Sequence, residues 1–265
     1  MKISCIQMDM RLGEPDWNFA RAEELVRAAA RTEHPDVAVL PETWNTGFFP
    51  KDLESCADRD GERTKAVFSA LARELNINIV CGSVANKRTE GFFNTAYVFD
   101  RAGEVIAEYD KTHLFTPSGE HESFLCGWHT CRFTLDGKSC GLIICYDIRF
   151  PELIRTMTLE GVDLLFAVAQ WPEKRTMHLE TLALARAIEN QMFLVLCNSV
   201  GTAGETRCGG HSAVIDPWGE YLAKAGDREE IITGEADFSV IEGIRSSINV
   251  FRDRRPELYA LDRPV

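Results

Sequence analysis

The sequence lacks the features that would assign it to a membrane or to nucleic acid. No apolar run approaches the roughly 20 residues that a membrane helix needs. Lys and Arg number 29 against 41 Asp and Glu, so the net charge is -12 and no basic surface is expected for nucleic acid or anionic lipid. The opening MKISCIQMDM has neither the long apolar region nor the small-residue cleavage site of a signal peptide, so we expect a cytoplasmic protein.

Paired cysteine spacing is also missing. The chain has 9 cysteines, an odd number, and no C-x-x-C pair. Four of them lie in apolar, strand-like runs: Cys5, Cys81, Cys140 and Cys197. Reduced core thiols are expected there rather than a disulfide framework. Cys126 and Cys131 flank His129 without the usual spacing of zinc ligands, so we predict neither a metal nor a cofactor.

Strand and helix patterns alternate along the whole chain. A hydrophobic content of 45% suffices for one well-buried core, and we expect a single domain over residues 1–265. Strands are expected at 2–8, 36–40, 77–84, 93–100, 104–109, 129–135, 139–144, 162–168, 192–198, 210–215, 221–225 and 231–236, and helices from an Asp16 cap and over 61–75, 151–160 and 175–189. This mixture fits two sheets between helix layers, but composition alone does not exclude a doubly wound sheet.

Cys145 is the strongest candidate for a catalytic residue. It lies in GLIICYDIRFPEL, where an apolar strand ends and Pro151 begins a helix. Backbone N–H groups and the helix dipole at such a turn favour a thiolate and can hold an oxyanion. Most free cysteines are simply small buried side chains, so the position alone does not establish a nucleophile.

Two further segments carry groups that suit a nucleophilic cysteine. Glu42 follows the short strand of DVAVLPET at its carboxyl end, where a carboxylate can serve as a general base. Lys111 in EYDKTHLF offers an ammonium that can neutralise a tetrahedral oxyanion. Taken singly, Glu42 could be a turn cap and Lys111 a surface charge.

Together these motifs resemble those of the nitrilase superfamily, the carbon–nitrogen hydrolases with a Glu-Lys-Cys catalytic set. LPET, YDKTHLF and CYDIRFPE occur in the family's order and spacing, and the resemblance extends from KISCIQMD to INVFRDRRPELY. Further matches are GSVANK, FNTAYVFD, ARAIENQ and DPWGE. The resemblance implies a four-layer α-β-β-α sandwich and amide hydrolysis through a thioester on Cys145, with Glu42 as base and Lys111 as oxyanion partner.

The resemblance also implies further site residues. Glu120 in PSGEHESF matches a second glutamate beside the lysine, with Glu122 as its competitor. The backbone N–H of Tyr146 is an expected oxyanion donor, and Trp171 in AVAQWPEKR matches a position that lines the substrate pocket. Arg149 and Arg175 are both candidates for pairing with a substrate carboxylate.

Within the superfamily, CYDIRFPEL, ARAIENQ, the segment GGHS and VFRDRRPELY resemble the omega-amidase-like branch. That branch acts on 2-oxoglutaramate or 2-oxosuccinamate; deaminated glutathione and N-carbamoyl amino acids are alternative substrates. One departure is Leu179 after His178, where the family often has Trp, which predicts a reshaped pocket. A non-catalytic binding protein and a thiol sensor are alternatives of another class.

The last 25 residues form an unusual tail. Residues 241–265 carry five arginines together with Val250, Phe251, Leu258 and Tyr259. Arginine and aromatic side chains are common interface anchors, and the resemblance implies a segment that packs across a partner subunit. We therefore expect a homodimer, with a surface extension as the alternative.

Overall fold

Two mixed sheets form the centre of the molecule, and the computed structural model describes residues 1–259. The first sheet has the order β16 (Glu230–Glu235), β1 (Lys2–Gln7), β2 (Val37–Val39), β4 (Asn78–Arg88), β5 (Gly91–Phe99) and β6 (Val105–Asp110), with β3 (Asp58–Arg59) beside β4 and β7 (Phe124–Leu125) beside β5. The second has the order β15 (Tyr221–Lys224), β14 (Ala213–Ile215), β11 (Phe193–Asn198), β10 (Leu164–Ala169), β9 (Lys138–Ile144) and β8 (Cys131–Leu135). A separate hairpin joins β12 (Val200–Ala203) to β13 (Thr206–Gly209).

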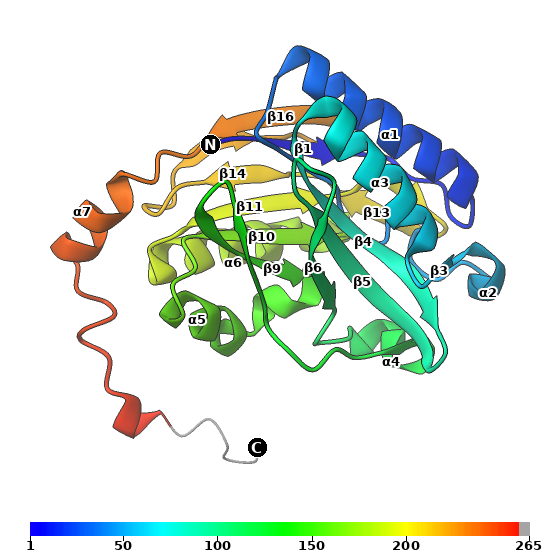
Figure 1. Ribbon diagram of the computed structural model, residues 1–265. Helices are drawn as coiled ribbons and strands as arrows, with labels where there is room; N and C mark the ends of the chain where they lie inside the picture. Colours follow the sequence, from blue (N-terminus) through cyan, green and yellow to red (C-terminus); the bar gives the residue numbers. More distant parts are fainter. Residues whose placement is uncertain (260–265) are drawn as a thin grey trace.

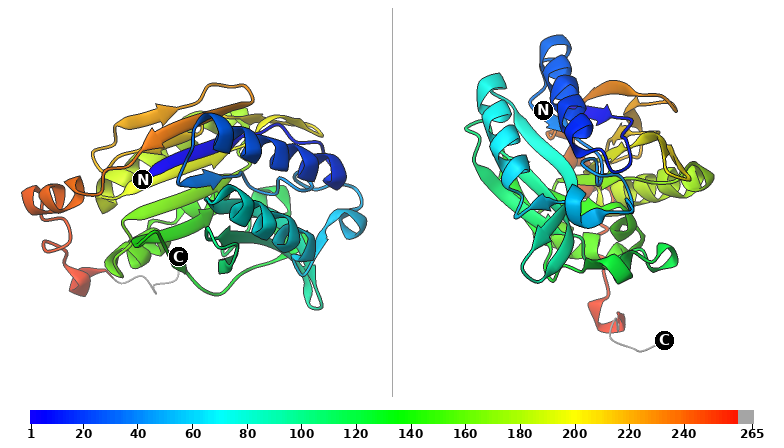
Figure 2. Two further views of the ribbon diagram at one scale, coloured as in Figure 1. Left: turned by 45° about the horizontal axis from the view of Figure 1, so that its top comes forward. Right: turned by 90° about the vertical axis from the view of Figure 1, so that its right-hand side faces the viewer.

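Helices cover the outer face of each sheet, as Figures 1 and 2 show. The α-helices are α1 (Pro15–Thr32), α2 (Leu53–Cys56), α3 (Glu62–Leu75), α4 (Glu120–Ser123), α5 (Pro151–Leu159), α6 (Thr176–Asn190) and α7 (Val240–Ser247). Short 3-10 helices are η1 (Thr116–Ser118), η2 (Cys145–Arg149), η3 (Glu173–Arg175) and η4 (Pro256–Leu258). None of the helices within residues 1–259 is long and apolar enough to cross a membrane.

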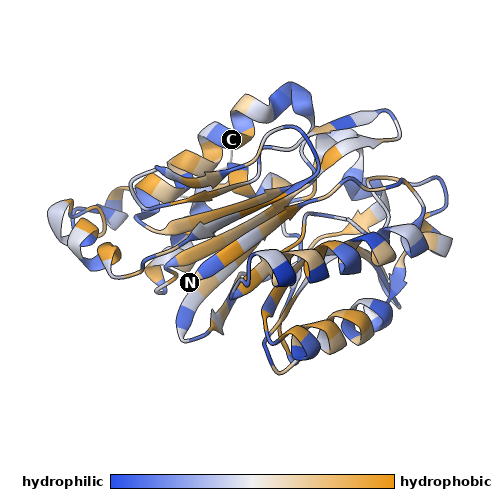
Figure 3. Cartoon of the chain, turned by 90° about the horizontal axis from the view of Figure 1, so that it is seen from above, coloured by the Kyte–Doolittle hydropathy of each residue, from blue (hydrophilic) through white to orange (hydrophobic). Residues whose placement is uncertain are grey.

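Three hydrophobic clusters account for the layers. One lies between the sheets and joins side chains such as Val39 of β2 to Phe166 of β10. A second packs α1 and α3 onto the first sheet, and a third packs α5 and α6 onto the second. The apolar colouring of the strands in Figure 3 agrees with sheets buried on both faces. The expected α-β-β-α sandwich is confirmed, and the doubly wound alternative is not observed.

The sequence pattern located most elements within a few residues, with specific errors. Asp16 does not cap α1: the helix begins at Pro15 with Glu14 in the cap position, and Asp16 lies in the first turn. The β12–β13 hairpin and α4 were not predicted, because their short polar segments have no strand or helix periodicity. Helix α7 occupies the start of the segment expected to be a tail, and its Ile241 and Ile244 side chains are buried against the sandwich. Gln191 donates to the carbonyl oxygen of Ile248 at 2.9 Å, and beyond this contact the segment leads to η4, away from the sheets (Figure 1).

Candidate active site

Three strands from the two sheets end at one place. Cys145 follows β9 and Gln170 follows β10; these strands are parallel, so their carboxyl ends share an edge. Glu42 follows β2 of the other sheet after Leu40 and Pro41. Its backbone N–H donates to the carbonyl oxygen of Ala169 at 3.3 Å, which joins the two sheets at this edge. The sandwich thus places a carboxylate of one sheet against a thiol of the other.

Cys145 lies on a strained turn. Its φ of 48° is in the left-handed region, which costs a residue with a Cβ free energy. The strand ends at Ile144, and η2 begins at Cys145 itself. The Asp147 carboxylate accepts a hydrogen bond from the backbone N–H of Ile144 at 3.0 Å and so fixes the turn. Strand, strained turn and helix present the thiol to the pocket at the edge of the sheet.

Beneath the thiol, an ammonium is enclosed between two carboxylates. Lys111 Nζ donates to Glu42 Oε1 at 2.8 Å and to Glu120 Oε1 and Oε2 at 3.0 and 2.9 Å. All three side chains are completely buried. A buried charge needs a partner of opposite sign, and here each charge has one. The structure therefore brings together the three charged residues singled out in the sequence, and Glu122 is exposed instead.

The electrostatics of the site keep the thiol protonated at rest. Burial raises the pKa of Cys145 well above its usual value, and the nearby Glu42 charge raises it further, while Lys111 acts in the opposite direction. The expected thiolate-favouring environment is therefore wrong for the resting site. Burial likewise raises the pKa of Glu120, although the Lys111 ammonium opposes this shift. Burial alone would lower the pKa of Lys111, but Glu42 and Glu120 more than offset it.

Two residues that the sequence reasoning gave no role complete the carboxylate environment. The Asn94 side-chain amide donates to Glu42 Oε1 at 2.9 Å and to Glu120 Oε1 at 3.2 Å. The backbone N–H of Gln170 donates to Glu42 Oε2 at 2.8 Å. Asn94 belongs to the FNTAYVFD match, which was the signal available in the sequence.

Asp147 links the lysine segment to the cysteine turn. Its carboxylate accepts from the Tyr109 hydroxyl at 2.9 Å and from the backbone N–H of His113 at 2.9 Å. The His113 ring also lies 2.8 Å from Asp147 Oδ1 through Nδ1 and stacks on Phe150 at 3.7 Å. His113 thus has a structural contact here rather than a pairing with the thiol.

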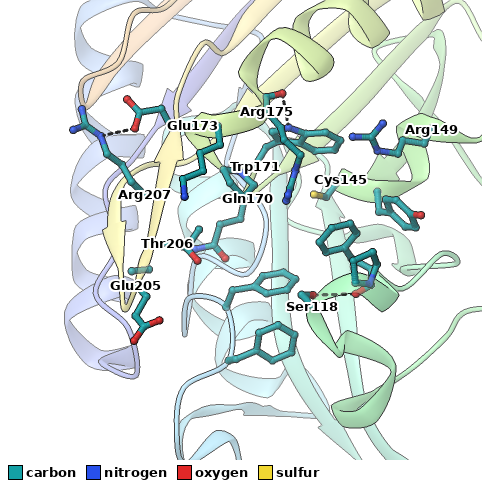
Figure 4. A pocket seen from close by; sticks show the side chains of 18 residues that line it. Ser118, Cys145, Arg149, Gln170, Trp171, Glu173, Arg175, Glu205, Thr206 and Arg207 are labelled. Atoms are coloured by element: carbon teal, nitrogen blue, oxygen red, sulfur yellow. Dashed lines mark hydrogen bonds and ion pairs between the residues drawn. The ribbon is translucent and has the colours of Figure 1, made fainter.

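Cys145 opens into a pocket of about 440 Å³ (Figure 4). Aromatic side chains form one part of its wall, namely Phe48, Phe49 and Phe115. The rim carries more positive than negative charge: the basic residues are Arg149, Lys174, Arg175 and Arg207, and the acidic residues are Glu173 and Glu205. A basic rim on a chain of net charge -12 favours an anionic ligand.

The structure places the predicted binding residues around this pocket. Tyr146 lines it and is the second residue of η2, where first-turn N–H groups have no partner inside the helix. Trp171 also lines it, and its indole N–H donates to the carbonyl oxygen of Arg175 at 2.9 Å. Leu179 packs in the outer core instead and is 1% exposed, so the expected effect of this residue on pocket shape is not observed.

The two candidate arginines differ in their surroundings. Arg149 lies over the Trp171 ring at 4.9 Å, and its guanidinium is 3.3 Å from His178 Nδ1. Arg175 lies over the Phe115 ring at 5.2 Å. Within residues 1–259 neither forms an ion pair with a carboxylate, whereas Arg207 pairs with Glu173 at 3.5 Å. Figure 4 shows both candidate guanidinium groups on the same side of the pocket as Cys145.

The described part of the chain offers no metal centre. Residues 1–259 hold no group of three His, Cys, Asp or Glu side chains that could bind an ion. Every cysteine is a free thiol, and Cys145 is one of the few that are partly exposed. The site itself presents a thiol, two carboxylates, an ammonium and the basic rim.

Comparison with known proteins identifies the family of this chain. The carbon-nitrogen hydrolase family model matches residues 2–246. A 2-oxoglutaramate amidase of Bacillus subtilis is 42% identical, with 97% of this chain and 98% of the relative covered. Human omega-amidase NIT2 is 34% identical, with 98% and 97% covered. A CN-hydrolase superfamily protein of Xanthomonas campestris, whose crystal structure has an arsenic adduct in the active site, superposes with a TM-score of 0.90 at 29% identity, over 96% of this chain and 97% of that one. This chain belongs to the carbon–nitrogen hydrolase family within the nitrilase superfamily, and it is a hydrolase of carbon–nitrogen bonds other than peptide bonds.

Proposed function

We propose that this chain is an omega-amidase that hydrolyses the terminal amide of 2-oxoglutaramate or 2-oxosuccinamate to the 2-oxo diacid and ammonia. The observation that carries the proposal is the position of Cys145. It lies between a buried Glu42–Lys111–Glu120 cluster and a pocket rim where Arg175 has no carboxylate partner within residues 1–259. Relatives that bear the names 2-oxoglutaramate amidase and omega-amidase support the substrate class.

The first half of the proposed reaction forms a thioester. Glu42 takes the proton of the Cys145 thiol as sulfur attacks the amide carbon. Lys111 Nζ and the backbone N–H of Tyr146 stabilise the oxyanion of the tetrahedral intermediate. The carbon–nitrogen bond then breaks, Glu42 returns its proton to the leaving nitrogen, and ammonia departs. Glu120 holds the ammonium of Lys111 in place throughout.

The second half hydrolyses the thioester. Glu42, again ionised, removes a proton from water as the oxygen attacks the acyl carbon. The same donors stabilise the second oxyanion, and the carbon–sulfur bond breaks to release the carboxylate product and regenerate the thiol. An acid–base group of this kind contributes on the order of a hundred- to ten-thousand-fold to the rate.

The rim supports a substrate that carries a carboxylate at the end opposite its amide. Arg175 is our choice for the residue that binds this carboxylate, because Arg149 is engaged with Trp171 and His178. The planar guanidinium forms paired hydrogen bonds with a carboxylate. The Trp171 ring forms the pocket wall beneath Arg149.

The test is ammonia release from a panel of amides at one pH. The panel contains 2-oxoglutaramate, 2-oxosuccinamate, deaminated glutathione, glutamine and an N-carbamoyl amino acid, with Cys145→Ala as control. We expect rapid release from the first two and none from the variant. Release from deaminated glutathione or the carbamoyl compound alone would keep the mechanism and change the substrate. Activity retained in Cys145→Ala would overturn the mechanism.

Assembly and location are parts of the same proposal. We propose a single-domain protomer, residues 1–265, that pairs into a homodimer through the segment that starts at Ile241; residues 260–265 lie outside the described part. Exposed apolar side chains on the segment support this, among them Ile248 at 48% and Leu258 at 66% exposure. The free cysteines support a reducing compartment such as the cytoplasm.

A further inference from the structure

Asn94 lies between the two carboxylates of the site, on the opposite side from the ammonium. Glu42 Oε1 accepts from both Lys111 Nζ and Asn94 Nδ2, at 2.8 and 2.9 Å. Glu120 Oε1 accepts from the same two nitrogen atoms, at 3.0 and 3.2 Å. Two donors and two acceptor oxygens therefore alternate in a closed ring of four hydrogen bonds. All four side chains are fully buried.

The orientation of the Asn94 amide is fixed by these contacts. An ionised carboxylate only accepts hydrogen bonds, so the NH₂ group and not the carbonyl oxygen must face Glu42 and Glu120. Asn94 Oδ1 has no hydrogen-bond partner among the atoms of residues 1–259. A buried acceptor without a protein partner is unfavourable, so the two bonds on the nitrogen side determine how the amide lies.

The sheet holds Asn94 at this place through its backbone. The backbone N–H of Lys111 donates to the carbonyl oxygen of Asn94 at 2.9 Å, directly after the β5–β6 pairing of Thr95 with Asp110. The amide and the ammonium therefore come from adjacent strands of one sheet and keep a fixed separation. The carboxylates come from elsewhere, from the segment after β2 and from α4.

Charge counting shows why a neutral donor is needed. Two carboxylates and one ammonium leave a net charge of -1 in a cluster of completely buried side chains. A second cation at the position of Asn94 would neutralise that charge and, through its positive field, make Glu42 a weaker base. A neutral amide supplies hydrogen bonds to the charged form without adding a charge.

We propose that Asn94 is a positioning residue that keeps Glu42 and Glu120 both ionised beside a single ammonium and directs Glu42 to use Oε2 as the base. Lys111 and Asn94 occupy Glu42 Oε1, whereas Oε2 accepts one hydrogen bond, from the backbone of Gln170. That oxygen retains a lone pair for the proton of Cys145. The use of Glu42 Oε2 as the base rests on the proposed base role of Glu42. The ionisation of both carboxylates does not depend on any substrate.

The groups that act on these carboxylates come from several elements. Lys111 and the two glutamates act on one another, and Cys145 from η2 lies within reach of all three charges. Cys208 of β13 also lies near Glu42. Neither thiol is replaced by the variants below, so a change of pH response is assignable to the amide.

The first test measures stability against pH and needs no substrate. In Asn94→Leu both carboxylates lose a donor, and the folded-state pKa of Glu120, which burial already raises, should rise above that of the wild type. A group with a raised folded pKa loses its stabilising contribution as pH rises through that value. The melting temperature of Asn94→Leu should therefore fall further below wild type at pH 8 than at pH 5, and the two deficits should differ by about 4 °C.

Asn86→Leu is the matched control. Asn86 is an equally buried asparagine on β4, and its amide donates only to the Tyr97 and Thr95 hydroxyl groups. The same substitution there removes uncharged partners, so its deficit should be the same at pH 5 and pH 8. An Asn94→Leu deficit that is equally independent of pH would overturn the proposal, because it would indicate a packing role alone.

Asn94→Asp separates shape from charge. The aspartate has the shape of asparagine. If Asn94 only fills space, Asn94→Asp should therefore destabilise the protein less than Asn94→Leu. Our proposal predicts the reverse order at pH 8, because a third carboxylate then faces Glu42 and Glu120. At pH 5 a protonated aspartic acid donates a hydrogen bond, and most of the deficit should disappear. An aspartate variant more stable than the leucine variant at pH 8 would contradict the proposal.

Activity gives the second readout. The acid limb of the kcat/KM profile of Asn94→Leu should move to higher pH by about one to two units, since a hydrogen bond to a charged group has that strength. If the acid limb of the Asn94→Leu profile stays at the wild-type pH, Asn94 does not act on Glu42, even if the rate is lower. A wild-type enzyme that released no ammonia from any amide would count against the proposed function, and the stability–pH test would still decide the role of Asn94.

Discussion

Lys111 Nζ lies 2.8 Å from Glu42 Oε1, and neither side chain has solvent-exposed surface. Glu120 contacts the same ammonium at 2.9 Å. Because burial removes the hydration of all three groups, each depends on the others for its charge. The contact is therefore a structural feature, and experiment can separate this role from the catalytic role that we propose for it.

Replacing the lysine should remove turnover and destabilise the fold. Lys111→Met leaves two buried carboxylates without a cation, which should lower the free energy of unfolding by about 3 kcal/mol at pH 7.5. Without the Lys111 ammonium, burial raises the folded-state pKa of Glu120 further, so the deficit should grow as pH rises from 5 to 8. Urea denaturation at several pH values measures this. Lys87→Met, which removes a surface pair with Glu54, should cost less than about 0.5 kcal/mol.

Replacing the base should separate thiol reactivity from turnover. Burial and then the charge of Glu42 raise the pKa of Cys145, so Glu42→Gln should lower this pKa and leave Lys111 facing the thiol. We expect iodoacetamide to alkylate Cys145 at lower pH than in the wild type, as followed by peptide mass spectrometry. Ammonia release should nevertheless fall at least about a hundred-fold, because no group protonates the leaving nitrogen.

The control for this variant is Glu173→Gln, which removes a carboxylate at the pocket rim. It should leave the alkylation profile of Cys145 unchanged. Full turnover in Glu42→Gln would refute the assignment of the base. An alkylation profile equal to that of the wild type would show that the Glu42 charge does not act on the thiol.

Removing the rim guanidinium should affect binding of charged substrates. Arg175→Met should raise KM for 2-oxoglutaramate about ten- to a hundred-fold and leave kcat nearly unchanged, since a hydrogen bond to a charged group has that strength. A neutral amide of the same length should show no change. Arg207→Met is the matched control, because Arg207 is paired with Glu173. Equal effects on charged and neutral amides would exclude a carboxylate contact.

The sequence located the site through residues that stand at strand ends. Cys145, Glu42 and Trp171 each follow a run of apolar residues, and such a position predicts an edge of a sheet. Asn94 lies within the long strand β5, where its side chain looks like any other strand position. Its contacts exist only because Glu42 and Glu120, 52 and 26 residues away, fold against it. Neither periodicity nor propensity contains that information.

A carboxylate in place of an exposed apolar side chain on the C-terminal segment should disrupt the proposed homodimer. Leu258 is 66% exposed and lies in η4, away from the body of the sandwich. Leu258→Asp should shift the protein toward monomer in sedimentation velocity, because burial of a carboxylate in an apolar interface is costly. Trp128→Asp, at an 89% exposed apolar residue outside the segment, should sediment like the wild type. A wild-type monomer, or an unchanged Leu258→Asp dimer, would refute the proposed interface.

The strained turn at the nucleophile should be visible in the stability of two inactive variants. Cys145 has a φ of 48°, where any residue with a Cβ is disfavoured and glycine is not. Elsewhere glycine is usually less stable than alanine, because the unfolded chain gains more freedom. Here Cys145→Gly should therefore equal Cys145→Ala in stability or exceed it, with a difference of up to about 1 kcal/mol. At Ile144, with its extended backbone, alanine should be the more stable replacement. A glycine variant clearly less stable than alanine at position 145 would show that the turn stores no strain, and the thiol would then owe its position to Asp147 alone.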